Sequence, residues 1–543
     1  MKRRMQLCLA PVVIVLVAAG AERLDEISGR RIRAHVQFLS SDLLEGRGVG
    51  ARGGQLAEQY LASQLAVAGL KPAGENGTWY QTVRLIGVQT LPSSRLMAEK
   101  DGQTLELRWQ QDFVGATHRQ REQEEWEAEA VFVGHGIVAP QENWNDYKTS
   151  VKGKLVVLFT NEPQPDNPKV FKGRALTYAG RWTYKFEEAL RQGALGALII
   201  HTTETAGYGW EVVRNSWSKE DPQVPLEGQS ALQFAGWVTQ EAGERLLKMA
   251  GYSVPQLLKA ADERSFRPIP LGIRFRGRFQ ARLRSIESRN VLGLVEGSDA
   301  QRKSQYVIYS AHWDHLGRAV AVGGDDIYNG AIDNATGCGI VLETARAWAA
   351  LERKPRRSAV FLFFTAEEAG LRGSEYYARH PLFPPGRTAL NINYDALYPW
   401  GRTRDLILLG AERTTAWKTL QQAAARMGLR LSSDPAPEQG SYYRSDHFML
   451  ARAGIPAFIV KMGSDYEGKP AGWGEEMFRK YNSQRYHQPS DEFDENWDFS
   501  GLEQAARFGF LAGRMIADQD ELPGWQKGDE FARARAASLK AGR

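Results

Sequence analysis

Histidines and carboxylates follow several apolar runs in the second half of the chain. His312 and Asp314 come after YVIYSA, Glu367 and Glu368 follow AVFLFFT, and Asp395 follows ALNINY. Taken singly, such residues are common: paired glutamates, for example, suit the start of a helix. Their repeated position is more informative, because the carboxyl ends of parallel strands meet at one edge of a sheet. The pattern therefore predicts one polar site there.

Two further candidates lie in polar loops, Asp333 in YNGAIDNATG and His487 in RYHQPSD. Imidazole and carboxylate are ligands that zinc accepts, and a pair of zinc ions needs several of them with one carboxylate shared. Two histidines and three carboxylates provide that set. Adjacent Glu367 and Glu368 project in different directions, so one can bind metal while the other takes a proton from water.

The elements that must position these residues alternate between strand and helix. Continuous apolar strands such as YVIYSA are followed by helices such as GCGIVLETARAWAAL, in which Ile340, Ala345 and Trp348 share a face. This alternation predicts an α/β fold with a mostly parallel central sheet flanked by helices.

Changes in composition and hydrophobic pattern along the 543 residues predict several segments. Short β runs between 128 and 275, bordered by loops rich in Pro, Asn and Asp, indicate an inserted β-rich domain. We expect disorder only in the polar tail after Pro523. The predicted segments are a leader over 1–21, the N-terminal part of the main domain over 22–127, the insertion over 128–275, the main domain over 276–520 and the tail over 521–543.

The first 21 residues have the layout of a secretory signal peptide, with Lys2, Arg3 and Arg4 before an apolar run and small residues at the end. The alternative is a membrane anchor, but the run is shorter than the roughly 20 residues that a span needs. We therefore expect export to the periplasm or the extracellular space, and no membrane span after cleavage.

Charge and cysteine content restrict the partners and the covalent structure. The formal charge is +5, and loss of the basic leader leaves a nearly neutral chain, so nothing favours a nucleic-acid partner. Cys8 leaves with the leader and Cys338 remains alone, so no internal disulfide is expected. The oligomeric state stays open.

The run AHWDH, GAIDNATG, TAEEAGLRGS, NYDA, YRSDH and RYHQPSDE, within about 286–515, resembles the co-catalytic dizinc exopeptidases of metallopeptidase family twenty-eight, in the MH clan. The segment 128–275 resembles the protease-associated domain inserted in many of them. The resemblance implies two zinc ions per chain. His312 and Asp395 would hold one, Glu368 and His487 the other, and Asp333 would bridge them.

The same resemblance implies roles for residues around the metals. Glu367 would be the general base, and Asp314 would orient His312 as a partner of its imidazole. Tyr442 would steady the oxyanion, with Tyr443 as the neighbouring alternative. The role of His315 stays undetermined.

The implied activity is that of a zinc-dependent exopeptidase acting on peptides, foremost an aminopeptidase of the bacterial secreted type. A carboxypeptidase or a hydrolase of acidic dipeptides is the first alternative, because arginines could bind a substrate carboxylate. Less favoured are a non-catalytic binding protein and a transferase like glutaminyl cyclase, which uses a single zinc. The candidate arginines are Arg402, Arg404, Arg444 and Arg485.

Overall fold

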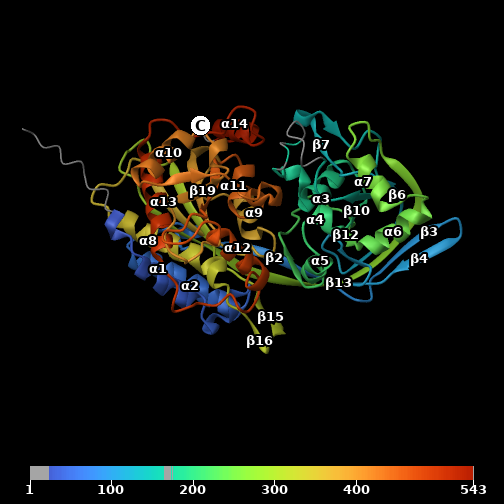
Figure 1. Ribbon diagram of the computed structural model, residues 1–543, viewed down its shortest axis with the longest axis horizontal. Helices are drawn as coiled ribbons and strands as arrows, with labels where there is room; N and C mark the ends of the chain where they lie inside the picture. Colours follow the sequence, from blue (N-terminus) through green and yellow to red (C-terminus); the bar gives the residue numbers. More distant parts are fainter. Residues whose placement is uncertain (1–23, 164–170, 172, 174, 542–543) are drawn as a thin grey trace, which may run out of the picture.

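The structure, a computed structural model, describes residues 24–163, 171, 173 and 175–541, and these form two lobes side by side (Figure 1). The predicted leader, residues 1–21, lies outside the described residues. In the described part of the chain, no helix is both long and apolar enough to cross a membrane.

The first lobe is built on a parallel sheet. Strand β14 (Tyr306–His312) lies between β17 (Ser358–Phe364) and β18 (Thr388–Tyr394), parallel to both, and β21 (Ala457–Met462) continues the parallel order beyond β18. All seven residues of β17 and of β18 are buried. Because both faces are covered, β17 is almost continuously apolar instead of alternating.

Antiparallel strands extend this sheet at both sides. On one side β17 pairs with β13 (Ile269–Val295), which pairs in turn with β2 (Tyr80–Thr90). On the other side β21 pairs with β19 (Asp405–Leu409), which carries the short β20 (Arg430–Ser432). The predicted mostly parallel α/β sheet is therefore confirmed, with antiparallel borders.

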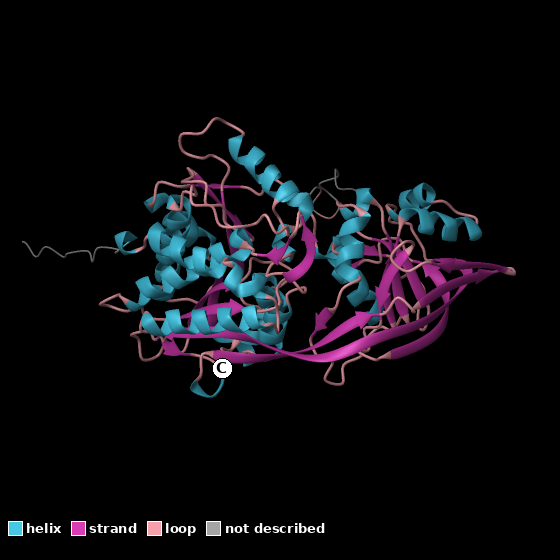
Figure 2. Cartoon of the chain, turned by 90° about the horizontal axis from the view of Figure 1, so that it is seen from below, coloured by secondary structure: helices cyan, strands magenta, loops and turns pink. Residues whose placement is uncertain are grey.

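Helices cover both faces of the sheet (Figure 2). Phe361 and Phe363 of β17 pack into one core with helices α1 (Gly29–Leu39), α8 (Thr336–Ala349) and α13 (Ser500–Asp518). The intervening Leu362 packs into another core on the opposite face, where α9 (Arg372–Arg379) and α11 (His447–Arg452) lie. The period of two along the strand places its neighbours on opposite faces. Further helices of this lobe are α2 (Arg52–Val67), α10 (Trp417–Arg426) and α12 (Trp473–Gln484). Helix α5 (Trp210–Trp217) belongs to the second lobe, where its Val213 is buried.

The predicted helix after β14 forms as α8 and is buried on nearly every side. Its Trp348 is fully buried and donates its indole N–H to the hydroxyl of Tyr309 at 3.1 Å. That hydroxyl donates in turn to the carbonyl of Gly509 at 2.9 Å, in α13. A side chain at Gly513 would collide with the hydroxyl, so the glycine allows α13 to approach the sheet closely.

The second lobe has its own parallel sheet and its own cores. Strands β6 (Gln123–Phe132), β9 (Leu155–Phe159), β10 (Gly196–Ile200) and β12 (Phe234–Val238) pair in parallel in this order. Their apolar residues fill two separate cores, one on each face. The helices of this lobe include α3 (Trp182–Arg191), α4 (Thr203–Ala206), α6 (Gln240–Met249) and α7 (Val254–Ala261).

The second lobe begins earlier in the chain than residue 128. Strands β3 (Arg95–Lys100), β4 (Gln103–Leu107) and β5 (Phe113–Ala116) pair within its sheet, and Leu96 and Phe113 belong to its core. Only two of the six residues of β3 and one of the five residues of β4 are buried. Their sequences therefore lack the apolar runs on which the expected boundary relied.

One strand belongs to both lobes. β13 contains 27 residues, and its first half pairs with β3 and β6 of the second lobe. Its second half pairs with β2 and then with β17 of the first lobe. The expected boundary near residue 275 thus falls inside a continuous strand, which Figure 1 labels between the lobes.

The expected disorder of the tail after Pro523 is wrong for residues up to 541. Trp525 and Phe531 are buried, and helix α14 (Ala532–Ala541) follows. Arg535 is also buried and donates to the carbonyls of Pro385 and Pro523, each at 2.8 Å. The tail is polar in composition, but two aromatic residues and one arginine are enough to fix it to the first lobe.

Candidate metal centre and active site

Three predicted ligands meet at the carboxyl edge of the parallel sheet. His312 is the last residue of β14, Asp395 follows the end of β18, and Asp333 lies in the turn Ala331–Ala335 before α8. The Nε2 atom of His312 is 3.2 Å from Asp333 Oδ1 and 3.6 Å from Asp395 Oδ1. The Asp333–Asn334 peptide bond is cis. The sheet thus brings one imidazole against two carboxylates.

The other two predicted ligands approach the opposite oxygen of Asp333. His487 Nε2 is 3.4 Å from Asp333 Oδ2 and 3.1 Å from Glu368 Oε2. Glu368 lies shortly after β17, and His487 lies in the loop after α12. Asp333 therefore stands between the two imidazoles, with one carboxylate oxygen directed to each.

The electrostatics of this cluster are dominated by histidine and carboxylate contacts. Burial and Glu368 oppose a charge on Asp333, but His312 and His487 lower the pKa of Asp333 below its usual range. Burial likewise opposes a charge on His487, yet Glu368 and Asp333 raise the pKa of His487 to about 10. Each imidazole thus faces carboxylate oxygens that favour a positive charge at its position.

The donor set fits zinc. The donor atoms of His312, Asp333 and Glu368 lie within 4.8 Å of one another, as do those of His312, Glu367 and Asp395. His487 Nε2 is buried and has no partner in hydrogen-bond geometry, although two carboxylates are near it. Imidazole nitrogens and carboxylate oxygens that converge in this way can bind a cation in place of a proton.

Glu367 lies beside the cluster as a further carboxylate. Burial is the main cause that raises the pKa of Glu367 well above its usual range, and Glu368 and Asp395 act in the same direction, while His312 opposes them. A carboxylate with a raised pKa can accept a proton near neutral pH and release it again.

The carboxylate of Asp314 does not make the expected contact with the imidazole of His312. Its carboxylate is 3.8 Å from His312 Nδ1, whereas its backbone carbonyl is 3.2 Å from that atom. The carboxylate instead accepts the backbone N–H of Glu367 at 3.1 Å and of Glu368 at 3.4 Å. Asp314 thus positions the histidine through its main chain and the glutamate pair through its side chain.

His315, for which the sequence offered no role, contacts a predicted ligand. Its Nδ1 is 2.6 Å from Glu368 Oε1, while its Nε2 is buried without a hydrogen-bond partner. Its ring centre lies 5.6 Å from that of His487. His315 therefore fixes the oxygen of Glu368 that does not face His487.

The structure does not bring the hydroxyl of Tyr442 into the cluster. It donates to the carbonyl of Ala457 at 3.2 Å, and Tyr443 donates to Glu530 at 2.9 Å. Tyr486, which the sequence reasoning missed, stacks on His487 with ring centres 3.9 Å apart. The only sequence signal for Tyr486 is its position next to a predicted ligand.

Two other buried residues that the sequence reasoning missed hold the loops of the site. Arg47 donates to the carbonyls of Trp313, at 2.7 Å, and Gly330, at 2.9 Å. Asp491 accepts the backbone N–H of Ile332, at 3.2 Å, and of Asp333, at 3.1 Å. The motif LEGRG offers a weak signal for Arg47, since a lone arginine stands in a Gly-rich turn after an apolar helix.

Most of the arginines considered for a substrate carboxylate already have partners. Arg402 lies 3.8 Å from Glu467, Arg404 lies 2.9 Å from Asp465, and Arg485 donates to a backbone carbonyl at 2.8 Å. They are therefore engaged within the protein. Arg444 is exposed and has no side-chain partner among the residues that the structure describes.

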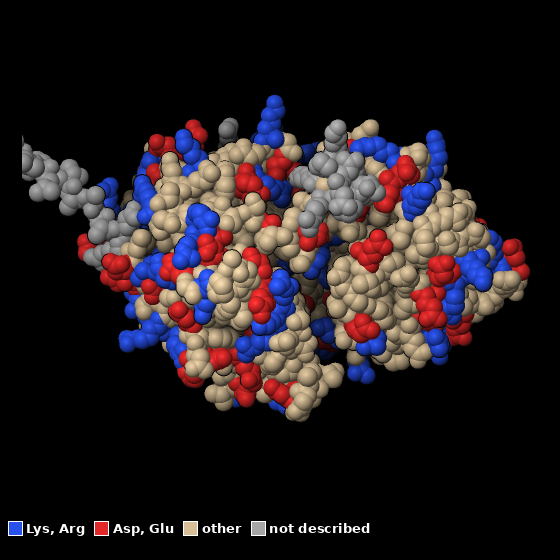
Figure 3. Space-filling view, viewed as in Figure 1, with Lys and Arg blue, Asp and Glu red and all other residues tan. Residues whose placement is uncertain are grey.

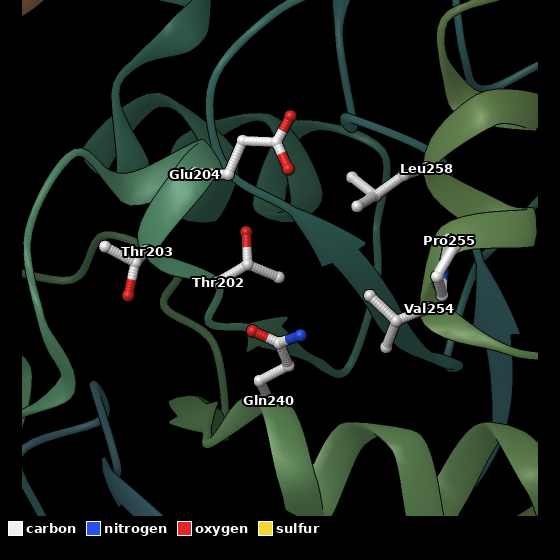
Figure 4. A pocket seen from close by; sticks show the side chains of 7 residues that line it. All are labelled: Thr202, Thr203, Glu204, Gln240, Val254, Pro255 and Leu258. Carbon is white, nitrogen blue, oxygen red and sulfur yellow. The ribbon is translucent and has the colours of Figure 1, made fainter.

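A cavity of 360 Å³ lies in the second lobe (Figure 4). It is bordered by α4, by the first turn of α6 and by α7. It contains none of the predicted ligands, and its charged lining is limited to Glu204. The lining residues are Thr202, Thr203, Glu204, Gln240, Val254, Pro255 and Leu258.

Parts of the chain are similar to known proteins. Residues 290–508 match the model of peptidase family M28. The aminopeptidase NAALADL1 of Mus musculus is 31% identical over 171 residues, which are 29% of this chain and 21% of the relative. Aminopeptidase YwaD of Bacillus subtilis strain 168 is 26% identical over 212 residues, which are 38% of this chain and 40% of the relative. The chain thus spans less than half the length of either relative.

A solved structure shares the fold over nearly the whole chain. It is an aminopeptidase from Aneurinibacillus sp. strain AM-1, which aligns with a TM-score of 0.51 and 19% sequence identity. The alignment covers 92% of this chain and 97% of that protein. The likeness therefore extends through both lobes.

Proposed function

Since residues 290–508 match the model of peptidase family M28, we propose that this chain is a zinc-dependent exopeptidase, foremost an aminopeptidase that removes N-terminal residues from peptides. One observation carries the proposal: the two oxygens of Asp333 face two different imidazoles, His312 at 3.2 Å and His487 at 3.4 Å. A carboxylate shared in this way is what a pair of zinc ions requires.

The five predicted ligands divide into two sets around Asp333. His312 and Asp395 would hold one zinc ion, Glu368 and His487 would hold the other, and Asp333 would bridge them. Zinc bound here would supply a Lewis acid that polarises the scissile carbonyl and makes water more acidic. The contacts of Asp314 and His315 would keep His312 and Glu368 oriented for this purpose.

Glu367 would be the general base. Its carboxylate would take a proton from the attacking water and pass it to the amine that leaves. Burial raises the pKa of Glu367, which lets it hold this proton between the two steps. Adjacent Glu368 is turned to His487, with 3.1 Å between Oε2 and Nε2, so the two glutamates can serve separate roles.

A tyrosine hydroxyl would steady the negative charge that develops on the carbonyl oxygen. Tyr442 can do so only after its hydroxyl leaves the carbonyl of Ala457. Tyr486 stacks on His487, and its hydroxyl has no partner among the described residues. We therefore assign this role to Tyr486 before Tyr442.

The location of the enzyme and the role of the second lobe complete the proposal. The leader layout of residues 1–21 supports export to the periplasm or the extracellular space. The second lobe would be a protease-associated domain that caps the cleft and limits the size of the substrate. Its contact with Tyr443 supports this role, because nearby Ser445 accepts a 2.8 Å hydrogen bond from Asn393, two residues before Asp395.

A peptide library tests the activity. Zinc-loaded mature protein would be incubated with peptides present both with a free and with an acetylated N-terminus, and mass spectrometry would show which end shortens. We expect loss of residues from free N-termini only, and no cleavage by Glu367→Ala. Loss of residues from the C-terminus of acetylated peptides would show that the activity is that of a carboxypeptidase and not of an aminopeptidase. No cleavage of any peptide would refute the exopeptidase proposal.

A further inference from the structure

One segment of the second lobe enters the sheet of the first. The segment lies between α5 and β12, both of which belong to the second lobe. In it, strand β11 (Asp221–Gln223) pairs antiparallel with β2, which pairs in turn along the second half of β13. The surface is hollowed between the two lobes (Figure 3). The lobes are therefore joined by the pairing of β11 with β2 as well as by β13.

Val224, the residue after β11, belongs to the apolar cluster that surrounds the turn with the two site glutamates. It is buried in this cluster together with Ala366, which directly precedes Glu367. Ala369 directly follows Glu368 and is partly buried against the same cluster. Buried side chains of β2 and β13 complete it, namely Val83, Leu85 and Ile286. The cluster thus joins the second lobe to both sides of the glutamate pair.

Arg372 forms another contact between this turn and the segment. It is the first residue of α9, and its Nε donates to the carbonyl of Pro222 at 3.0 Å. The same guanidinium lies 3.7 Å from the carboxylate of Asp221. The main-chain N–H of Arg372 donates to the carbonyl of Ala366 at 2.9 Å, which closes the turn. Arg372 therefore fixes the end of the turn to the segment of the second lobe.

The backbone conformation of the turn depends on contacts of this kind. Ala366 has a φ of 53°, in the left-handed region that a residue with a side chain adopts at a cost. After it, the backbone N–H groups of Gly370 and Leu371 both donate to the carbonyl of Glu367 at 2.8 Å. A strained residue persists only where neighbouring groups hold it. The second lobe supplies two such contacts, the apolar cluster and the bond to Arg372.

The segment is itself fixed at both of its ends. Gln120, in the connection between β5 and β6, donates its Nε2 to the carbonyl of Val224 at 2.8 Å and accepts the backbone N–H of Leu226 at 3.3 Å. Before β11, Glu220 accepts two 2.7 Å hydrogen bonds from Arg284 of β13. The segment therefore has a defined place between its own lobe and the turn.

Resting on the proposed peptidase function, we propose that the second lobe positions the glutamate pair through Val224 and the carbonyl of Pro222. Val224 and Arg372 are positioning residues, because they act on Glu367 and Glu368 through the backbone of the turn. A general base must lie within hydrogen-bond reach of the water whose proton it takes, and a small misplacement lowers the rate strongly. The second lobe would thus contribute to the chemical step in addition to limiting access to the site.

Two variants and a matched control test the proposal in the whole chain. Val224→Ala removes two methyl groups from the apolar cluster, and Arg372→Met removes the bond to Pro222. Val213→Ala is the control, because Val213 is also buried but packs in a core that the second lobe forms alone.

The first measurement is backbone hydrogen exchange of the metal-free protein, read by mass spectrometry over residues 365–372. Each variant should raise exchange in this peptide about tenfold, as for loss of two buried methyl groups or of one hydrogen bond from a charged donor. The control should leave it unchanged. Unchanged exchange in both variants would overturn the proposal. An equal rise in the control would also overturn it, because the effect would then be a general loss of stability.

The second measurement is hydrolysis of leucyl-glycyl-glycine by the zinc-saturated protein. Both variants should lower kcat roughly 10–100-fold and change KM less than about twofold, and the control should keep both values. Raised exchange with wild-type kcat would overturn the contribution to catalysis. If wild-type protein hydrolyses no peptide, the proposed function fails, and the exchange measurement still decides whether the second lobe holds the turn.

Discussion

Replacing Arg47 tests whether one buried guanidinium holds the loops of the candidate site. Arg47 is 1% exposed, and it donates to four backbone carbonyls from three segments of the chain. Two of these carbonyls, of Trp313 and Gly330, belong to the loops that carry His312 and Asp333. The other two belong to Leu39 and Asn329. Arg47→Met should therefore lower both the stability and the affinity for zinc.

The size of the loss follows from these four bonds. A hydrogen bond from a charged donor contributes about 1.5–3 kcal/mol, so four give roughly 6–12 kcal/mol before desolvation. Removing the guanidinium recovers its desolvation cost, which is several kcal/mol for a buried ion. The net loss of unfolding free energy should be about 3–5 kcal/mol. Arg318→Met is the matched control, because Arg318 is exposed in the hairpin Gly317–Tyr328 and, among the described residues, forms an ion pair only with Asp326. This substitution should cost at most about 1 kcal/mol.

The measurement is urea unfolding of the chelated and the zinc-loaded forms, together with zinc affinity by competition with a coloured chelator. Arg47→Met should unfold at lower urea in both forms and bind zinc at least about tenfold more weakly, as for loss of contacts that orient metal ligands. A loss below about 1 kcal/mol, within the range of ordinary surface substitutions, together with unchanged zinc affinity, would refute the reasoning.

Three further predictions concern the catalytic base, the metal content and the acid side of the stability profile. Glu367→Gln should lower kcat by roughly 10²–10⁴-fold with wild-type zinc content, and loss of zinc together with activity would contradict its role as a base. His487→Ala should bind one zinc fewer per chain than wild type by elemental analysis; equal content would remove His487 from the ligands. Burial lowers the pKa of His35 to about 4 in the folded protein, whereas the same side chain has a pKa of about 6.5 in the unfolded chain. The neutral side chain therefore adds to the free energy of unfolding above pH 6.5, and this contribution is lost as the pH falls towards 4. His35→Gln should flatten that decline by up to about 3 kcal/mol in urea titrations at several pH values, and an unchanged decline would exclude His35 as its source.

The parallel core of the fold could be predicted from the sequence, because burial on both faces leaves a direct pattern of apolar residues. The runs that became β14 and β17 are of this kind. The limits of the second lobe could not be predicted, since few residues of β3 and β4 are buried. These strands are identified only by pairing, β3 with β13 and β4 with β3. The packing of the tail rests on Trp525 and Phe531, whose partners lie far away in the sequence.

The types and strand-end positions of His312 and Asp395 predicted that they would approach each other. The support around them could not be predicted in the same way. Arg47 and Trp313 are separated by 266 positions in the sequence, and no local pattern links them. The direction of the hydroxyl of Tyr442 is also a tertiary property, because its acceptor, Ala457, belongs to β21.

The shared strand β13 determines how the two lobes can move. Domains joined by a flexible linker can swing independently, but here 27 residues of continuous strand pass from one sheet into the other. Any movement of one lobe relative to the other must therefore bend or twist this strand, and the ladder of hydrogen bonds resists such deformation. The two lobes should therefore move relative to each other only over a small range. The second lobe cannot be excised without removing part of β13 from the sheet of the first lobe.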